Sequence, residues 1–342
     1  MKIVLAIYSR NNSILQIDKT LKKMGHDVKV VYTDEYTQCC SYLSKKFDKF
    51  GFKSGRKAFE DGWKKSLLLL IDDFNPDMVL FVNLPGYMLL PKDLQKISSK
   101  TRVYIWFVDG IQDHPEYEAY YSYTDKIAVF ELQDVEYLKR LNVKDVAYVP
   151  VGYSDVYDVG KNTSRTIDIS FVGSPFKNRL EILEPLAREA IRQGWNFKIY
   201  GPFYKENYIW KKYLLKNKYP CLFKFLNNGS VMAGDVANIY TISKIVLNIH
   251  DEKHYSPNPR TFDILATGTL EICDQRANYV GNLQPDKALV VFKNTEELLL
   301  KIDYYLSHPL ERESIASYGK EHNVYSMEYS LQKILDGERY DG

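Results

Sequence analysis

The sequence lacks the short motifs of several large protein classes. None of its 18 glycines falls in G-x-G-x-x-G or G-x-x-x-x-G-K-[ST], which argues against a dinucleotide-dependent dehydrogenase and a P-loop NTPase. Only four cysteines occur, without a C-x-x-C pair, and neither a signal peptide nor a transmembrane span is recognisable in the apolar runs. We therefore expect a reduced, cytoplasmic protein.

Charge of one sign is also missing. The formal net charge is +2, with basic and acidic residues interspersed, which argues against bulk electrostatic capture of nucleic acid. Aromatic residues are plentiful instead, with 28 tyrosines against 16 phenylalanines. Tyrosine suits surfaces that meet sugars, because it combines a flat ring with a hydroxyl, although codon bias is an equally good explanation.

The hydrophobic pattern predicts two α/β domains. Short apolar runs, from Ile3–Tyr8 onward, alternate with helical spacing, which is typical of doubly wound parallel sheets. We predict a first Rossmann-like domain over 1–152, a polar linker over 153–165 and a second domain over 166–320. A helical segment follows over 321–342, which can pack back on the first domain. A ligand is expected in the cleft between two such domains.

The segment Asn258–Asp263 is the most informative part of the chain. Asn258 is a good N-cap and Pro259 is favoured at the first helical position, so Arg260 and Thr261 lie in the first turn. Free backbone N–H groups and the helix dipole favour an anion there, and a guanidinium can grip a diphosphate. On spacing alone, an ordinary capped helix with a solvated arginine is an equally good reading.

A longer run around this segment resembles a known family. Ser256–Asp274, read as Ser-Pro-Asn-Pro-Arg-Thr-Phe-Asp-Ile-Leu-Ala-Thr-Gly-Thr-Leu-Glu-Ile-Cys-Asp, resembles the donor-domain motif of glycosyltransferases related to the spore-maturation protein CgeB. Further segments resemble that family in the same order: Asp168–Ser174 with Arg179 behind it, Phe197–Pro202 and Ser243–His250. The resemblance covers the C-terminal half; in the N-terminal half the best matches are Asn75–Asp77 and Trp106–Asp109.

The resemblance implies the GT-B fold and a nucleotide-sugar donor site in the C-terminal domain. In similar enzymes an acidic residue at the position of Asp263 binds the donor's ribose, and the anomeric configuration is mostly retained. A second acidic residue often stands eight positions earlier, where this chain has Tyr255; His254 or Tyr255 are the candidate substitutes. The candidate donor-binding residues follow strands or open helices: Gly173, Ser174, Lys177, Arg179, Gly201, Asn248, His250, Asn258, Arg260, Thr261 and Asp263.

The N-terminal domain is the expected acceptor side. Asp109 ends an apolar strand, so its carboxylate is a candidate general base for the acceptor hydroxyl, although an aspartate that caps a loop is a somewhat better reading on spacing alone. Asp113 and His114 are close competitors, and Tyr8 and Ser9 follow the first strand. Arg260 and Asp109 are therefore the candidate catalytic pair.

No metal or other cofactor is expected. The chain has no Asp-x-Asp, the feature by which GT-A glycosyltransferases hold a metal ion, and basic groups can take over the metal's electrostatic role. His250 and His254 stand four apart, but Asp251 occupies the glutamate place of a zinc-protease motif, so zinc is disfavoured.

The sequence thus predicts transfer of a sugar from a nucleoside diphosphate to the hydroxyl of a glycan, a lipid-linked molecule, a protein or a nucleic acid. A UDP-sugar epimerase of the same fold and a non-catalytic sugar-nucleotide-binding protein are the alternatives. Two stretches that mix bases with aromatics, Lys53–Lys65 and Lys205–Phe225, suggest peripheral membrane contact, although a solvated helix is the commoner reading.

Overall fold

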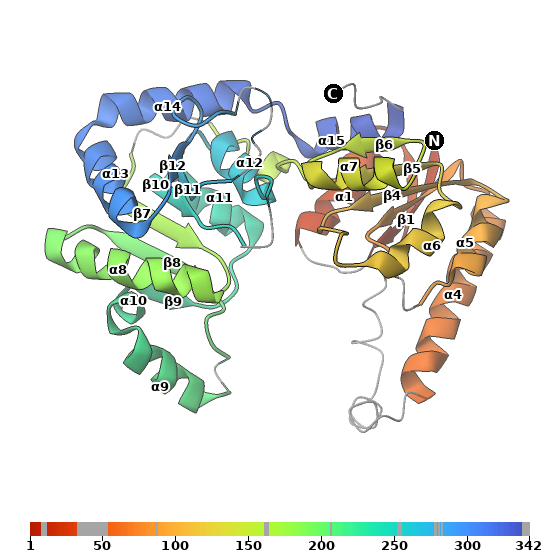
Figure 1. The fold of residues 1–342 in the computed structure, drawn as a ribbon, viewed down its shortest axis with the longest axis horizontal. Coiled ribbons are helices and arrows are strands. Elements are labelled where there is room, and N and C mark those ends of the chain that lie inside the picture. The colour runs from red at the N-terminus through yellow and green to blue at the C-terminus, as the bar shows by residue number, and fades with distance from the viewer. Residues whose placement is uncertain are drawn as a thin grey trace. The chain divides into compact units, whose positions relative to one another are not determined.

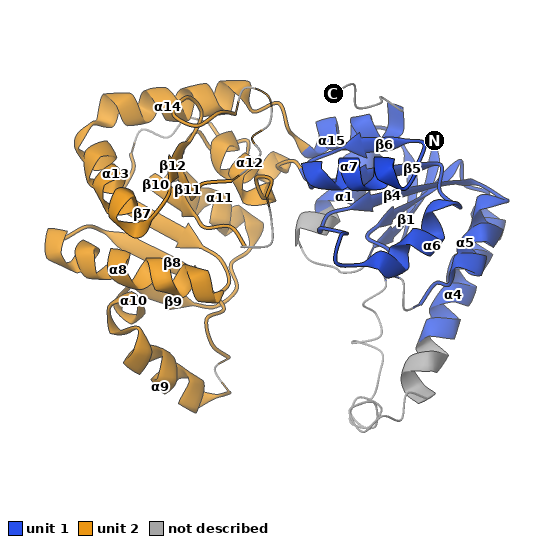
Figure 2. Ribbon diagram, viewed as in Figure 1, with its two compact units in different colours: residues 1–151, 327–342 blue, residues 152–326 orange. Residues whose placement is uncertain are grey.

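The computed structural model describes residues 1–7, 12–32, 54–85, 88–160, 164–205, 207–251, 255–276, 279, 281 and 283–336, with the backbone alone for 12–15 and 54–59. Figure 1 shows the ribbon, and Figure 2 shows the two compact units into which the chain divides. The first unit comprises Met1–Val151 and the chain from Met327 onward, and the second comprises Gly152–Ser326.

The first unit is built on a parallel sheet of six strands in the order β2-β1-β3-β4-β5-β6. Its strands are β1 (Lys2–Ile7), β2 (Asp27–Tyr32), β3 (Met78–Val82), β4 (Arg102–Phe107), β5 (Lys126–Val129) and β6 (Val146–Tyr148). Its helices are α1 (Asn12–Lys23), α4 (Ser54–Phe74), α5 (Pro91–Ser98), η1 (Pro115–Tyr117), α6 (Glu118–Tyr121), α7 (Leu132–Arg140) and α15 (Met327–Asp336).

The strands of this sheet are apolar because helices cover both of its faces. All five residues of β3 are buried, as is β1 from Ile3 to Ile7. The alternate β1 residues Ile3, Leu5 and Ile7 pack in one cluster with residues of α1 and α15. The ammonium of Lys126 at the start of β5 donates to the carbonyls of Lys333 (2.9 Å) and Ile334 (3.1 Å), so it caps α15.

The second unit repeats this architecture with the strand order β12-β11-β10-β7-β8-β9. Its strands are β7 (Ile167–Val172), β8 (Phe197–Gly201), β9 (Leu226–Asn228), β10 (Ser243–Asn248), β11 (Leu270–Asp274) and β12 (Val290–Phe292). Its helices are η2 (Asp155–Tyr157), α8 (Lys177–Gln193), α9 (Ile209–Lys218), α10 (Pro220–Phe225), α11 (Ala233–Thr241), α12 (Pro259–Ala266), α13 (Thr295–Ser307) and α14 (Pro309–His322).

The core of the second unit lies on both faces of this sheet. On one face Ile245 and Leu247 of β10 pack with residues of β7, α8 and α13, and on the other Val246 packs with α11 and α12. Tyr157 of η2 joins the second cluster, so the polar stretch expected as a linker contributes a helical turn to this unit. The sequence prediction of two parallel α/β domains is confirmed.

Candidate active site

The strand order of the second unit defines a switch point between β7 and β10. From β7 the chain proceeds outward to β8 and β9, and then β10 returns to the other side of β7. In open parallel sheets the crossovers on the two sides of such a point leave on opposite faces, and ligands bind at the carboxyl ends of its strands. Gly173 follows β7 and Asn248 ends β10, so both lie at this edge.

Helix α12 begins beside the end of β10. The Asn258 side chain accepts a hydrogen bond from the Thr261 backbone N–H (3.3 Å), and Pro259 occupies the first helical position. This N-cap fixes the start of the helix at the predicted residue and leaves further N–H groups of the first turn for an anion.

A buried polar network ties α12 to the sheet. The Asn248 side-chain amide, fully buried, donates to Asn258 Oδ1 (3.1 Å), Thr261 Oγ1 (3.2 Å) and Glu271 Oε1 (2.7 Å). The Thr261 hydroxyl also donates to Glu271 Oε1 (2.9 Å). Burial raises the pKa of Glu271 to about 7, against the hydrogen bonds from Asn248 and Thr261. Glu271, which was not among the residues predicted from the sequence, therefore belongs to the same hydrogen-bond network as Asn248, Asn258 and Thr261.

Arg260 lies at the centre of this edge. Its Nη1 donates to Asn248 Oδ1 (3.2 Å), and its charge opposes the rise that burial causes in the pKa of Tyr240. The Tyr240 ring stacks on the ring of Tyr157, with centroids 6.3 Å apart, so two stacked aromatic rings lie near the Arg260 guanidinium. A guanidinium carries five N–H donors, which leaves several for a ligand.

Asp263 stands one turn further along α12. Burial raises its pKa to about 8, and the charge of Arg260 only partly offsets this. Among the residues that the structure describes, burial and the charge of Arg260 act on the Asp263 carboxylate, and no hydrogen bond adds to them. The carboxylate is partly buried and has no donor among these residues, which makes Asp263 suited to accept hydrogen bonds from ligand hydroxyls.

Arg179 is a second, more deeply buried cation at the same edge. Its Nε donates to the Ile249 carbonyl (2.9 Å) and its Nη1 to the Ser174 carbonyl (3.1 Å), so it joins the ends of β10 and β7. Burial and the nearby charge of Arg260 lower its pKa to about 10. Two guanidiniums that repel each other define a place where an anion is stabilised.

Gly173 and Gly201 bring the backbone of two strand ends together. The Gly173 N–H donates to the Tyr200 carbonyl (2.9 Å), and Gly201 has a φ of +149°. A Cβ at Gly201 would overlap the Gly173 carbonyl, and one at Gly173 would lie 2.9 Å from Phe171. Both positions thus require glycine, because the Gly173 backbone and the Phe171 ring occupy the space that a Cβ would need.

His250 is buried at the end of β10, and its Nδ1 lies 2.8 Å from Asp274 Oδ1. Burial lowers the pKa of His250 despite the opposing effect of Asp274. Burial would raise the pKa of Asp274, but the hydrogen bonds from His250 and the charge of Arg276 hold it below its usual value. His250 Nε2 is buried without a hydrogen-bond partner in the described part of the chain.

The remaining donor-side candidates differ in position. Ser174 contributes its carbonyl to Arg179, whereas the Lys177 side chain is 87% exposed and pairs with Glu181 (3.8 Å). His254 lies outside the described residues. Among the residues within the described ranges, no group of three or more His, Cys, Asp or Glu side chains is arranged to hold a metal ion.

The acceptor-side candidates lie in the first unit, at the carboxyl end of β4. Asp109 is exposed and accepts a hydrogen bond from Asn83 Nδ2 (2.9 Å), while Asn83 Oδ1 accepts from the Val108 N–H (2.9 Å). Asp113 is exposed, and His114 Nδ1 lies 3.0 Å from Glu116 Oε1. Tyr8 and Ser9 lie outside the described residues.

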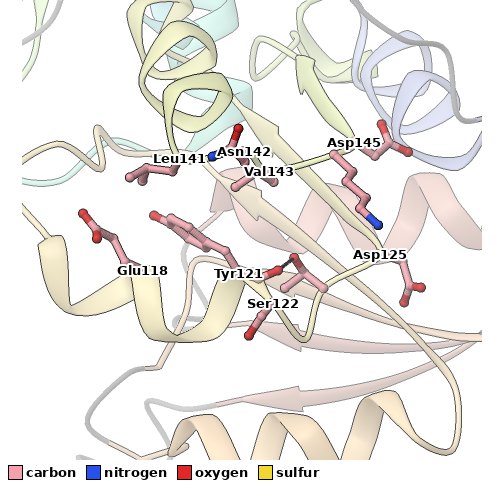
Figure 3. A pocket seen from close by; sticks show the side chains of 10 residues that line it. Glu118, Tyr121, Ser122, Asp125, Leu141, Asn142, Val143 and Asp145 are labelled. Carbon is pink, nitrogen blue, oxygen red and sulfur yellow. Dashed lines mark hydrogen bonds between the residues drawn. The ribbon is translucent and has the colours of Figure 1, made fainter.

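A pocket of about 630 Å³ lies elsewhere in the first unit, between α6, the turn after α7 and the residues before β5 and β6 (Figure 3). Asp125 and Asp145, which line it, directly precede β5 and β6, so it opens at the amino ends of these strands. Ligands of parallel sheets bind at the opposite ends, so this pocket is separate from the candidate active site.

Comparison with known proteins agrees with this architecture. Residues 179–336 match the model of a family described as glycosyl transferase-like. No curated protein matches the sequence.

No helix within the described ranges is long and apolar enough to cross a membrane.

Solved structures resemble the chain over its whole length. A glycosyltransferase from Rickettsia africae is 16% identical, with a TM-score of 0.68, and the match covers 98% of this chain and 97% of that one. Sucrose-phosphate synthase from Thermosynechococcus elongatus is 12% identical (TM-score 0.66), with 97% of each chain covered. HepE from Anabaena, in complex with UDP-glucose, is 9% identical (TM-score 0.65), with 98% of each covered.

These likenesses establish the class of fold. Two six-stranded parallel sheets with flanking helices, matched over nearly the whole chain, are the GT-B fold of glycosyltransferases. The family match covers residues 179–336 of the chain, and the structural neighbours show its fold.

Proposed function

We propose that the protein is a glycosyltransferase that binds a nucleoside-diphosphate sugar at the carboxyl edge of the second sheet. The observation that carries the proposal is the convergence of Arg179, Arg260 and the start of α12 at the switch point, where the charges of the two arginines repel each other. A diphosphate placed there would relieve this repulsion and accept hydrogen bonds from free N–H groups.

The rest of the donor fits the groups around this point. Gly173 and Gly201 hold the ends of β7 and β8 close together at this edge, and Asp263 would accept hydrogen bonds from the ribose hydroxyls. UDP-glucose in the HepE complex is the kind of ligand that this arrangement would hold. His250, with its buried Nε2, is the candidate contact to the sugar or the phosphate next to it.

In the proposed reaction, the acceptor oxygen forms a bond to the anomeric carbon on the same face of the sugar from which the diphosphate departs, while the bond from that carbon to the diphosphate oxygen breaks. Arg260 and the α12 N–H groups would stabilise the negative charge of the departing diphosphate, the role that a metal ion has in other transferases. We propose that the reaction is metal-independent and retains the anomeric configuration. Asp109 is the proposed acceptor of the hydroxyl proton.

A thermal-shift screen with UDP, GDP, dTDP and CMP identifies the base. A ligand at 100 times its dissociation constant stabilises the folded state by about 2.7 kcal/mol, and we expect one nucleotide to raise the melting temperature by several degrees. If none of them stabilises the protein at millimolar concentration, the donor-site assignment is wrong.

Product analysis with the matching nucleotide sugars then decides the activity. A transferase releases the nucleoside diphosphate together with a glycoside or free sugar, in the presence of EDTA as well as without it. An epimerase converts the donor into its isomer without any acceptor, and a binding protein leaves it unchanged. Either of these last two outcomes would refute the proposed transfer.

A further inference from the structure

Helix α9 of the second unit exposes an unusual set of side chains. Ile209, Trp210, Tyr213 and Leu214 are 57–66% exposed, and no residue of this ten-residue helix is buried. The preceding Tyr208 is 46% exposed. Large apolar side chains exposed singly are ordinary, but several gathered on one helix mark an interaction surface.

The apolar side chains lie on the outer face of the helix. At about 100° per residue, Ile209 and Tyr213 stack one turn apart, and so do Trp210 and Leu214 beside them. Leu215 points in the opposite direction and packs, partly buried, against the core of the second unit. Most surface helices turn their apolar face toward the core. In α9 the broad apolar face is turned toward solvent instead. Figure 1 shows α9 at the periphery of the second unit, beyond α10.

The borders of this face are basic. Lys211, Lys212, Lys216 and Lys218 flank the apolar residues, and residues 207–219 contain no acidic side chain. The ammonium of Lys211 lies 5.1 Å from the Tyr208 ring centroid and 5.3 Å from that of Trp210, so charge and aromatic surface are adjacent. A second copy of the chain docked face to face would bring lysines against lysines, which disfavours self-association through this helix.

We propose that α9 is a membrane-docking helix that lies in the interface of an anionic lipid bilayer. Tryptophan and tyrosine favour the headgroup level, and leucine and isoleucine reach the acyl boundary. The flanking lysines would pair with anionic headgroups, each contributing roughly a fivefold gain in partitioning. The loop that leads to α9 leaves the carboxyl end of β8, so docking would hold the candidate donor edge near the membrane surface.

Vesicle cosedimentation tests this inference without reference to catalysis. We expect the full chain to bind vesicles of phosphatidylcholine with 30% phosphatidylglycerol, and to bind pure phosphatidylcholine vesicles at least tenfold more weakly. Added salt should weaken the binding, because the headgroup attraction is screened.

Two variants and a matched control identify the surface. Trp210→Ala/Leu214→Ala should reduce partitioning at least tenfold, and replacement of the four lysines by Gln should reduce it roughly 600-fold at low salt. Leu300→Ala/Leu310→Ala removes apolar side chains that are 73% and 88% exposed on α13 and α14, and should leave binding unchanged. Alanine favours helix, so each alanine variant keeps its fold, as circular dichroism can verify.

Three outcomes would overturn the inference. The first is that the wild-type chain does not bind anionic vesicles. The second is that the α9 double variant and its control bind equally well. The third is that the wild-type chain is a dimer and the double variant is a monomer. The last would assign this face to a second copy instead. Sedimentation velocity of the same samples detects it.

Discussion

The protonation of Asp263 gives a quantitative test of the candidate site. Its pKa is raised to about 8 by burial, whereas an unfolded aspartate has a pKa of about 4. Below about pH 4 both states are protonated and the group costs no stability. Between about pH 4 and pH 8 the unfolded chain loses the proton while the folded protein keeps it. The free energy of unfolding therefore falls by up to about 1.4 kcal/mol per pH unit, and the loss levels off above pH 8.

The Asp263→Asn variant removes this titration. Relative to the wild type it should gain stability as the pH rises from 5 to 8, by up to about 4 kcal/mol over that range in the absence of ligand. Urea unfolding of both proteins at each pH measures the difference, in which the other titrating groups cancel. Asp303→Asn makes the same change at an exposed position of α13 and should show no such trend.

The opposite result would refute the reasoning directly. If the stability difference between wild type and Asp263→Asn stayed constant from pH 5 to pH 8, the Asp263 carboxylate would be well solvated or paired with a donor. The carboxylate would then not be the group that accepts hydrogen bonds from the ligand hydroxyls.

Three further substitutions test the geometry around the site and the first unit. Gly201→Ala places a Cβ against the Gly173 carbonyl at a φ of +149°, and should cost roughly 2 kcal/mol or more in urea unfolding; an unchanged midpoint would contradict this. Arg179→Met leaves two strand-end carbonyls without their donor and should cost roughly 2 kcal/mol, whereas Arg192→Met, exposed on the same helix, should stay within about 0.5 kcal/mol. Lys126→Met removes the cap of α15 and should speed hydrogen exchange in residues 327–336; equal protection would show that the cap is dispensable.

The sequence predicted the features that depend on local pattern. The alternation of apolar strands with helices determines both sheets, and the Asn258-Pro259 pair determines where α12 starts. N-cap chemistry acts over three or four residues, so it can be read directly from the chain. The tight turn at Gly201 after a strand was likewise predictable. The close contact of Gly201 with the Gly173 carbonyl on the neighbouring strand was not.

The missed features depend on contacts between distant residues. Glu271 lies between the apolar residues Leu270 and Ile272 of β11 and binds Asn248 and Thr261, 23 and 10 positions away. A charged residue inside a buried strand was the available signal, because such a residue needs a polar partner. The pairing of His250 with Asp274 had no such signal, since it follows from the register of β10 beside β11.

Calorimetric titration of the nucleoside diphosphate selected by the screen tests the central claim most directly. Arg260→Ala should weaken binding roughly 10- to 100-fold, because it removes charge-assisted hydrogen bonds to the diphosphate. Arg192→Ala makes the same substitution at an exposed position near the C-terminal end of α8. This variant should bind the nucleoside diphosphate with the affinity of the wild type. Equal affinity of all three proteins would contradict the account, because the diphosphate would then lie away from Arg260 and the start of α12.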